Sequence, residues 1–202
     1  MVPVRALEGA KSRLGDVLDA EERRELVERL LRGTVAAALA TLGVRLVLVV
    51  SPDPEVLDVA LNAGASGVRQ LTSGLNAGIA EALRDPAASG AARVLVLPGD
   101  LPGIAPFDIA ALLAAADAAE PSPRVVVLAT DRHGRGTNAL LLQPPDVIEP
   151  AFGGDSRAAH RRLAAAADAA YRETPDVLDM DLDTPDDLLL LESLRPEALR
   201  AG

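Results

Sequence analysis

The chain has 202 residues, enough for one domain with a sizeable core, and its 49% hydrophobic and 25% charged residues are typical of a globular protein. Only 1% of the residues are aromatic, which excludes a surface that binds bases by stacking them on aromatic rings. The formal net charge of −10 disfavours nucleic acid and anionic membrane as partners, because both attract basic surfaces.

The residue types present restrict the chemistry of any metal site. The chain has no cysteine, so a metal has to be held by oxygen ligands or by the two histidines, and Mg²⁺ suits oxygen ligands. The N-terminal residues lack the pattern of a secretion signal, and no apolar run approaches the length of a membrane span. We therefore expect a single cytoplasmic domain over residues 1–202 that has no membrane partner and is a monomer or a homodimer.

A basic segment follows the first expected strand, residues 2–4, which is expected to be short because it starts directly after Met1. The segment contains Arg5, Lys11 and Arg13 together with glycine and serine, a composition that can bind phosphates after a strand. A solvated basic loop is the alternative interpretation. Local basic clustering is more informative, however, in a chain that is acidic overall.

Helices and strands then alternate along the chain. Asp19 and Glu22 form a capping-box pattern, and apolar residues recur at helical spacing from there to Gly43, which predicts a long helix. Further helices are expected within residues 51–65, 76–83 and 109–116. Strands are expected at residues 45–50, 94–98, 124–129 and 138–143, with a shorter one at residues 67–71. Such alternation predicts an α/β fold.

The sequence of residues 94–103, VLVLPGDLPG, combines a buried strand with an acidic end. Its first five residues are apolar, as expected for a strand buried on both faces of a parallel sheet. Asp100 follows in a turn fixed by the prolines and glycines around it. Because ligands of open α/β sheets bind at the carboxyl edge of the strands, Asp100 is placed to hold a divalent metal, although capping of the next turn is the alternative.

A second turn of interest follows the strand expected at residues 67–71. Small polar residues lead there to Gly74, Leu75 and Asn76, where a helix begins. Such a turn can present backbone N–H groups to a ligand, or it can simply cap the helix.

The second half of the chain contains polar, glycine-containing loops at residues 130–137 and 152–156, and a helix is expected over residues 157–170. Glycines and Ser156 ahead of a helix N-terminus form a potential anion site. His160 lies four residues after Ser156 on the same helix face, where packing or capping is favoured over contact with a phosphate. His133 lies in the first polar loop and is expected to be solvated.

Near the C-terminus, VLDMDLDT at residues 177–184 predicts a short strand. Its alternate residues Asp179, Asp181 and Asp183 fall on one face, where a cation would relieve their mutual repulsion. The next residues predict the start of the last helix, with Thr184 as N-cap and no more than helix-start roles for Asp186 and Asp187.

Several of these segments together resemble one protein family. In chain order they are VPVR with AKSRL, GLNAG, PGDLP, GTNAL, FGGDS followed by His160, and DLDTPDDL. The ordered set is similar to the guanylyltransferases that include 2-phospho-L-lactate guanylyltransferase and bacterial phosphoenolpyruvate guanylyltransferase. The resemblance covers nearly the whole chain and implies a Rossmann-like nucleotide-diphospho-sugar transferase fold of the GT-A type, with a mixed, mostly parallel sheet flanked by helices.

The resemblance also implies a reaction, the transfer of GMP from GTP to the phosphate of a three-carbon acid with release of pyrophosphate. This is an early step in the biosynthesis of the deazaflavin coenzyme F-420. The acceptor is left open between phosphoenolpyruvate, 2-phospho-L-lactate and 3-phospho-D-glycerate, and the Arg- and Ala-rich composition favours a bacterial source and hence phosphoenolpyruvate.

Three other functions are alternatives. A molybdopterin-type nucleotidyltransferase of the same fold usually carries a glycine-rich LAGG-like first loop, where this chain has AKSRL. A non-catalytic GTP-binding module would bind GTP without releasing pyrophosphate. A glycosyltransferase of similar fold would need a sugar pocket that the sequence does not reveal.

The resemblance assigns roles to individual residues. Contact with the GTP phosphates is implied for Lys11 and Arg13, and proximity to the nucleotide for Gly74, Leu75 and Asn76. The implied Mg²⁺ ligands are Asp100 and Asp183, with Asp181 as a helper, and the implied acceptor-binding residues are Thr137, Gly153 and Ser156. The chain departs from the family pattern at Arg5, where Lys is expected, and at Gly99, where Ala is expected.

Overall fold

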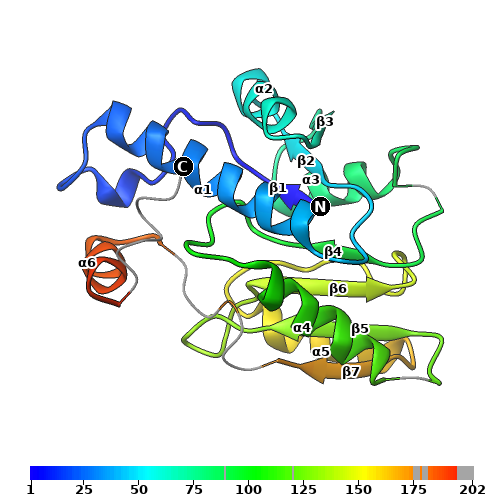
Figure 1. The fold of residues 1–202 in the computed structure, drawn as a ribbon. Coiled ribbons are helices and arrows are strands. Elements are labelled where there is room, and N and C mark those ends of the chain that lie inside the picture. The colour runs from blue at the N-terminus through cyan, green and yellow to red at the C-terminus, as the bar shows by residue number, and fades with distance from the viewer. Residues whose placement is uncertain (89, 120, 175–177, 179–181, 195–202) are drawn as a thin grey trace.

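The computed structural model describes residues 1–88, 90–119, 121–174, 178 and 182–194. Over these residues, strands and helices alternate along the chain as expected (Figure 1). In order, the elements are β1 (Val2–Pro3), the 3₁₀-helix η1 (Ser12–Leu14), α1 (Ala20–Ala40), β2 (Leu48–Ser51), α2 (Pro54–Asn62), β3 (Ser66–Arg69), α3 (Leu75–Leu83), β4 (Val94–Val96), α4 (Pro106–Asp117), β5 (Val125–Ala129), β6 (Ala139–Gln143), α5 (Ser156–Ala166), β7 (Ala170–Glu173) and α6 (Pro185–Leu194).

The strands form two sheets, in the orders β3-β2-β1 and β4-β6-β5-β7. The edges β1 and β4 meet at Met1, whose nitrogen donates to the Leu95 carbonyl at 2.8 Å and whose carbonyl accepts from the Leu97 N–H at 3.0 Å, so that the two continue as one mixed sheet. This is the bonding pattern of a parallel pair. Only β6 runs against its neighbours β4 and β5 within the described sheet, so the expected mixed, mostly parallel α/β architecture is confirmed.

Helices cover both faces of the sheet and bury a separate core on each. On one face α1, α2 and α4 pack over the sheet, and on the other face α3 and α5 do so (Figure 1). Successive side chains of β5 point to opposite faces of the sheet. Val125 and Val127 lie in one core, and Val126 and Leu128 lie in the other. This arrangement explains why the strand sequences are continuously apolar.

The first long helix follows its sequence pattern closely. Asp19 accepts a hydrogen bond from the Glu22 N–H at 2.9 Å, and the Glu22 carboxylate accepts from the Asp19 N–H at 2.8 Å. This reciprocal capping confirms the predicted start of α1. Val27, Leu31 and Val35, spaced by one helical turn, then bury one side of α1 in the first core.

The helix expected over residues 157–170 is too long. α5 ends at Ala166, Asp168 turns the chain in a left-handed conformation with φ 52°, and Ala170–Glu173 form β7 beside β5. The alanine-rich sequence is compatible with continued helix. β7 is only partly buried at the edge of the sheet, so it lacks the apolar run that marks the inner strands.

The strand expected over residues 177–184 is not found in the part of the chain that the structure describes. Residues 178 and 182–184 are irregular, and the others up to residue 181 lie outside the described residues. Asp179 and Asp181 therefore lie outside them, whereas Asp183 is described.

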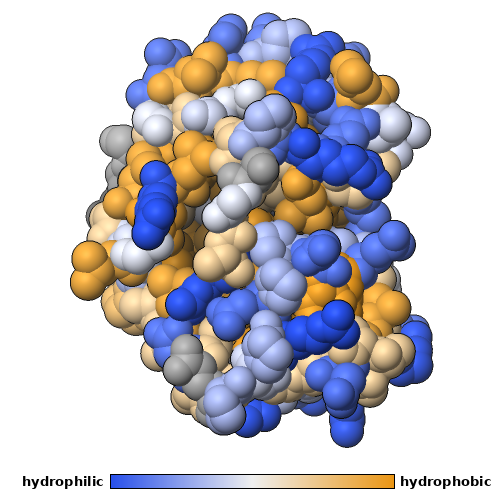
Figure 2. Space-filling view, turned by 90° about the vertical axis from the view of Figure 1, so that its right-hand side faces the viewer, coloured by the Kyte–Doolittle hydropathy of each residue, from blue (hydrophilic) through white to orange (hydrophobic). Residues whose placement is uncertain are grey.

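The surface carries hydrophilic and hydrophobic side chains intermixed, as one face of the molecule shows (Figure 2). Several large apolar side chains are exposed singly, Leu42, Leu71 and Phe107 most fully among the described residues. None of the helices within the described ranges has the length and apolar character needed to cross a membrane.

Candidate active site

The predicted site residues gather at one edge of the sheet. Lys11 follows β1 and Asp100 follows β4, so both lie beyond the carboxyl ends of parallel strands. Thr137 precedes β6, which runs in the opposite direction and therefore begins at this same edge. The pairing of Val96 with Leu140 brings the exit of β4 and the entry of β6 side by side. Ligands of open α/β sheets bind at this edge.

At its centre, the ammonium group of Lys11 bridges two carboxylates. Its Nζ donates to Asp100 Oδ2 at 2.5 Å and to Asp183 Oδ1 at 2.8 Å. The Lys11 side chain is 7% exposed, whereas those of Asp100 and Asp183 are 37% and 46% exposed. Burial alone would lower the pKa of Lys11, but the charges and hydrogen bonds of the two aspartates outweigh it and raise the pKa. Lys11 therefore stays charged while the aspartates remain open to a ligand.

The loop that carries Lys11 is held by side chains of other segments. Asp53, the N-cap of α2, accepts a hydrogen bond from the Leu7 N–H at 2.9 Å, and Leu14 is fully buried. Lys11 itself adopts a left-handed backbone conformation with φ 51° and ψ 36°, which is uncommon for a residue with a side chain. Such a conformation persists where the surroundings enforce it. The sequence pattern marks Asp53 as a cap but not as a support for this loop.

The turn that carries Asp100 packs tightly against β1. A Cβ atom placed on Gly99 would lie 2.7 Å from Val4 Cγ2 and 3.3 Å from Val2 Cγ1. Glycine at this position therefore lets the turn approach the first strand closely, and this fixes the backbone from which Asp100 projects. The departure from the family pattern at Gly99 has a local packing reason.

Asp183 is positioned by a small apolar cluster next to it in the chain. Leu182 is 1% exposed and packs in a cluster that joins residues of α6, η1 and α1. The buried members of the cluster are Leu14, Leu26, Leu30, Leu182 and Leu191. Lys11 lies three residues before one member and Asp183 directly after another, so this packing brings the two charges together across the length of the chain.

Asp187 does more than begin the last helix. Its carboxylate accepts hydrogen bonds from the N–H groups of Asp183 at 3.0 Å and Thr184 at 2.8 Å, and it forms an ion pair with Arg132. Burial raises the pKa of Asp187, but these hydrogen bonds and the arginine outweigh it and lower the pKa. Asp187 therefore fixes the backbone of Asp183, a role that the sequence pattern does not reveal, whereas the predicted N-cap role of Thr184 is confirmed by its bond to the Asp187 N–H.

The two carboxylates fit the requirements of Mg²⁺. Asp100 and Asp183 converge on one cation, the Lys11 ammonium, and both supply the oxygen ligands that this metal prefers. Within the described ranges no three His, Asp or Glu side chains cluster as a complete metal site. Mg²⁺ in nucleotide sites is commonly held by one or two carboxylates and completed by phosphates and water, so two ligands suffice. The proposed helper Asp181 lies outside the described residues.

Thr137, Ser156 and His160 form a second, buried polar group. Thr137 Oγ1 lies 2.9 Å from Ser156 Oγ and 3.1 Å from His160 Nδ1, and His160 Nε2 accepts from the Ala151 N–H at 2.9 Å. Burial lowers the pKa of His160 to about 4, so the ring is neutral near pH 7. Both ring nitrogens are bonded within the protein, which confirms the preference for packing and capping over phosphate contact.

Gly153 lies in the loop that leads into α5, residues 151–155, which we call the acceptor loop. A Cβ atom on Gly153 or Gly154 would meet nothing within 4 Å, so the loop borders open space at these two glycines. The structure thus brings together Thr137, Gly153 and Ser156, the three residues expected to bind the acceptor.

Asn76 connects the acceptor loop to the other predicted ligand turn. Its Nδ2 donates to the Phe152 carbonyl at 3.0 Å, and its Oδ1 accepts from the Phe152 N–H at 2.8 Å. Gly74 and Leu75 begin the same turn, where Gly74 has φ 101° and open space around a Cβ position. The side chain expected near the nucleotide is therefore bonded to the acceptor loop.

Two predicted or suspected phosphate-binding residues stay apart from these groups. Arg5 and Arg13 are both exposed, and no side-chain bond to the other described residues holds either of them in place. His133 is exposed, as expected.

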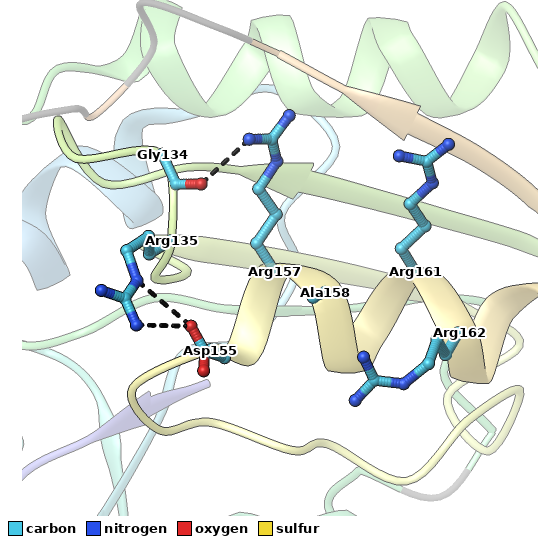
Figure 3. A pocket seen from close by; sticks show the side chains of 7 residues that line it. All are labelled: Gly134, Arg135, Asp155, Arg157, Ala158, Arg161 and Arg162. Carbon is cyan, nitrogen blue, oxygen red and sulfur yellow. Dashed lines mark hydrogen bonds and ion pairs between the residues drawn. The ribbon is translucent and has the colours of Figure 1, made fainter.

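An arginine-rich pocket of about 360 Å³ adjoins the acceptor loop (Figure 3). Arg157 and Arg161 extend from α5 toward the neighbouring strand, and Arg157 pairs with Glu173 at 2.8 Å, whereas Arg162 points away from them. Arg135 on the facing loop pairs with Asp155. The sequence pattern does not reveal this pocket, because arginines on the outer face of a helix are usually solvated.

The fold is that of the nucleotide-diphospho-sugar transferase type. The structure resembles that of a putative nucleotide-diphospho-sugar transferase from Desulfovibrio desulfuricans, with a TM-score of 0.77 and 16% identity over 100% of this chain and 89% of that chain. It also resembles a nucleotidyl transferase from Methanothermobacter thermautotroptrophicus, with a TM-score of 0.61 and 16% identity over 100% and 98% of the two chains. At these identities the likeness establishes the fold alone.

The sequence comparisons identify the family. Residues 1–193 match the family described as "Guanylyl transferase CofC like", and the chain belongs to this guanylyltransferase family. It is 46% identical to a phosphoenolpyruvate guanylyltransferase of Rubrobacter xylanophilus, over 96% of this chain and 92% of that protein. It is 43% identical to a protein of the same name from Sphaerobacter thermophilus, over 93% and 89% of the two chains. The resemblance found in the sequence is confirmed.

Proposed function

We propose that this protein transfers GMP from GTP to the phosphate of phosphoenolpyruvate and releases pyrophosphate, in the cytoplasmic biosynthesis of coenzyme F-420. The observation that carries the proposal is the buried Lys11 ammonium between two half-exposed aspartates at the sheet edge where the acceptor group also lies. The names of the similar proteins support phosphoenolpyruvate over 2-phospho-L-lactate as the acceptor.

The chemistry needs little from the protein beyond alignment and charge neutralisation. The acceptor phosphate attacks the α-phosphorus of GTP in line, a new P–O bond forms, and the bond to the pyrophosphate oxygen breaks. The attacking phosphate is already an anion, so no general base is required.

The first group of residues handles the charge of the triphosphate. Asp100 and Asp183 would hold Mg²⁺, which supplies charge neutralisation at the phosphates when bound. Lys11 would offset the negative charge of the departing pyrophosphate, since its raised pKa keeps it charged. Arg13 and the turn of Gly74, Leu75 and Asn76 would contact the nucleotide, the arginine from an exposed position that can move to a phosphate.

The second group holds the acceptor. Ser156 and Thr137 lie at the N-terminal end of α5, where the helix dipole favours an anion, and Gly153 leaves open space for it. Their buried, hydrogen-bonded hydroxyls give a fixed binding surface rather than a mobile one.

The decisive experiment measures pyrophosphate release by the purified protein with GTP and Mg²⁺ and with phosphoenolpyruvate, 2-phospho-L-lactate or 3-phospho-D-glycerate. We expect release that needs both GTP and phosphoenolpyruvate and stops when either is omitted. A parallel series with CTP and ATP tests the base. Binding of GTP without release for any acceptor would instead support a non-catalytic binding module, and preference for CTP would support another nucleotidyltransferase.

A further inference from the structure

The buried group around His160 forms a chain of hydrogen bonds whose direction can be worked out. The first hydrogen bond of the series comes from the Ala151 N–H, which donates to His160 Nε2 at 2.9 Å. A backbone N–H can only donate, so Nε2 carries a lone pair. A neutral imidazole has one proton, and it therefore lies on Nδ1. Burial, which lowers the pKa of His160 to about 4, favours this neutral ring.

The assigned tautomer sets the direction of the next bond, and we take the Thr137 hydroxyl as the donor in the bond that follows it. His160 Nδ1–H donates to Thr137 Oγ1 at 3.1 Å, and the Thr137 hydroxyl donates to Ser156 Oγ at 2.9 Å. Ser156 thus accepts a bond and keeps its own proton free. His160 is 0% exposed, Thr137 8% and Ser156 2%, so water competes little for any of these bonds.

The Ser156 proton has no acceptor within the described residues, although the side chain is almost fully buried. A buried donor without a partner is costly and calls for a ligand or water. Open space lies beside Gly153 and Gly154, and Ser156 follows them in the same turn, where its N–H bonds to the Gly153 carbonyl at 3.2 Å.

We propose that His160 is a positioning residue, which through Thr137 commits the Ser156 hydroxyl to donate its proton to an anionic oxygen of the acceptor. This inference rests on the proposed function and deepens it, since it assigns how the acceptor site selects its ligand. An acceptor oxygen that carries negative charge satisfies the Ser156 proton with a charge-assisted hydrogen bond.

The ring of His160 is held in place from its other side. Phe152 packs edge-on against it, with ring centroids 5.2 Å apart, and the Phe152 backbone is bonded in both directions by Asn76. The tautomer and the ring orientation are therefore both determined by neighbours outside the hydroxyl pair.

The first test reads the tautomer directly and does not depend on turnover. Nitrogen NMR of the protein labelled with ¹⁵N-histidine at pH 7 should show His160 neutral, with a proton on Nδ1 and none on Nε2. The assignment is made by the signal lost in His160→Gln. A proton on Nε2, or a charged ring at pH 7, would overturn the proposal whatever the enzyme's acceptor is.

The second test compares two variants, each of which keeps the hydrogen bond of only one of the two ring nitrogens of His160. In His160→Asn the new side-chain amide nitrogen lies close to the Nδ1 position and can still donate to Thr137. In His160→Gln the longer side chain carries its amide to the Nε2 position, where it can only accept from Ala151. With the acceptor that supports wild-type release, we expect His160→Gln to raise the acceptor KM about tenfold, the loss of roughly one hydrogen bond. His160→Asn should remain within about threefold, and the GTP KM should be unchanged in both.

A structural role alone would give a different result. His160→Leu serves as the reference for lost packing and bonding together, and thermal unfolding of all variants reports the fold. Equal acceptor KM values for the Asn and Gln variants, or parallel changes in the KM for GTP and acceptor, would overturn the proposal. Absence of wild-type release with every acceptor would contradict the proposed function and leave the tautomer test to decide this one.

Discussion

The ammonium group of Lys11 lies 2.8 Å from a carboxylate oxygen of Asp183, although the two residues are 172 positions apart in the chain. The contact closes the site by bringing the segment before the last helix onto the loop after the first strand. The leucines that flank these two residues bury each other in one cluster, so the electrostatic contact and the apolar packing form together. The geometry of this charged group therefore depends on the docking of α6.

Replacement of either aspartate should remove turnover and leave the fold intact. In Asp100→Asn and Asp183→Asn the Lys11 bridge loses one charge and the proposed Mg²⁺ site loses one ligand, so pyrophosphate release should fall about 100-fold or more. Circular dichroism should remain that of the wild type. Asp186→Asn, an exposed acid of the same helix start, is the matched control and should keep wild-type activity. Wild-type rates in Asp100→Asn or Asp183→Asn would disprove the metal assignment.

Removal of the lysine charge should change how the protein responds to metal. In Lys11→Met the two aspartates face each other without a partner, and Mg²⁺ alone should raise the thermal midpoint more than it does in the wild type. Pyrophosphate release should fall by about 100-fold or more. Adding Asp183→Asn should reverse the enhanced Mg²⁺ response. An Mg²⁺ response no larger than that of the wild type would show that Lys11 does not occupy the cation position.

Asp187 should support both stability and catalysis. The lowered pKa means that its carboxylate stabilises the fold above its ordinary pKa of 3.8, and that this contribution disappears as the pH falls through the still lower folded-state value. At pH 7 we expect Asp187→Asn to lower the free energy of unfolding by about 1–3 kcal/mol and to reduce kcat, because the Asp183 backbone loses its anchor. Urea unfolding and steady-state kinetics measure both effects. Asp186→Asn should change stability by less than about 0.5 kcal/mol.

His160 should make the protein lose stability in weak acid. Its pKa falls from 6.5 to about 4 on folding, so between these values the unfolded chain binds more protons and the free energy of unfolding decreases as the pH is lowered. The loss attributable to this residue is about 3 kcal/mol across that range. Urea unfolding between pH 4 and pH 7 should show a shallower slope in His160→Asn, and identical slopes would contradict the neutral, buried histidine.

The tight packing of Gly99 should be visible as energetic coupling. An alanine there would press its methyl group against Val4, and we expect Gly99→Ala to cost about 1–3 kcal/mol of stability. Val4→Ala removes the obstructing atom, so the double variant should be more stable than the sum of the single effects allows. Strict additivity in a double-mutant cycle would show that the turn adapts without strain.

Local sequence patterns predict much of the fold because the interactions behind them lie within a few residues of one another. The capping pair Asp19 and Glu22 and the apolar run of β4 determine their structure within a few residues. β7 is missed because a partly buried edge strand has no apolar run, and the alanines before it hide the end of α5. The strand expected over residues 177–184 rests on the alternation of acids rather than on an apolar run, and only residues 178 and 182–184 of it are described.

The sequence predicts the charged residues of the site but not the residues that hold them in place. Asp100 and Lys11 stand out because charge follows an apolar strand. Asp53 and Asp187 have the pattern of ordinary helix caps, and only the fold places the Leu7 and Asp183 N–H groups within reach of them. The contacts of His160 join segments distant in sequence, so no spacing rule predicts them.

The paired hydrogen bonds between Asn76 and Phe152 join two segments that we expect to bind the two substrates. A ligand that orders the turn at the start of α3 also restrains the acceptor loop, and the reverse holds equally. Thermodynamic reciprocity then requires GTP and the acceptor to change each other's affinity by the same factor, which titration of each substrate in the presence of the other measures. We expect this coupling between the substrates to depend on the Asn76 side chain, which carries no charge.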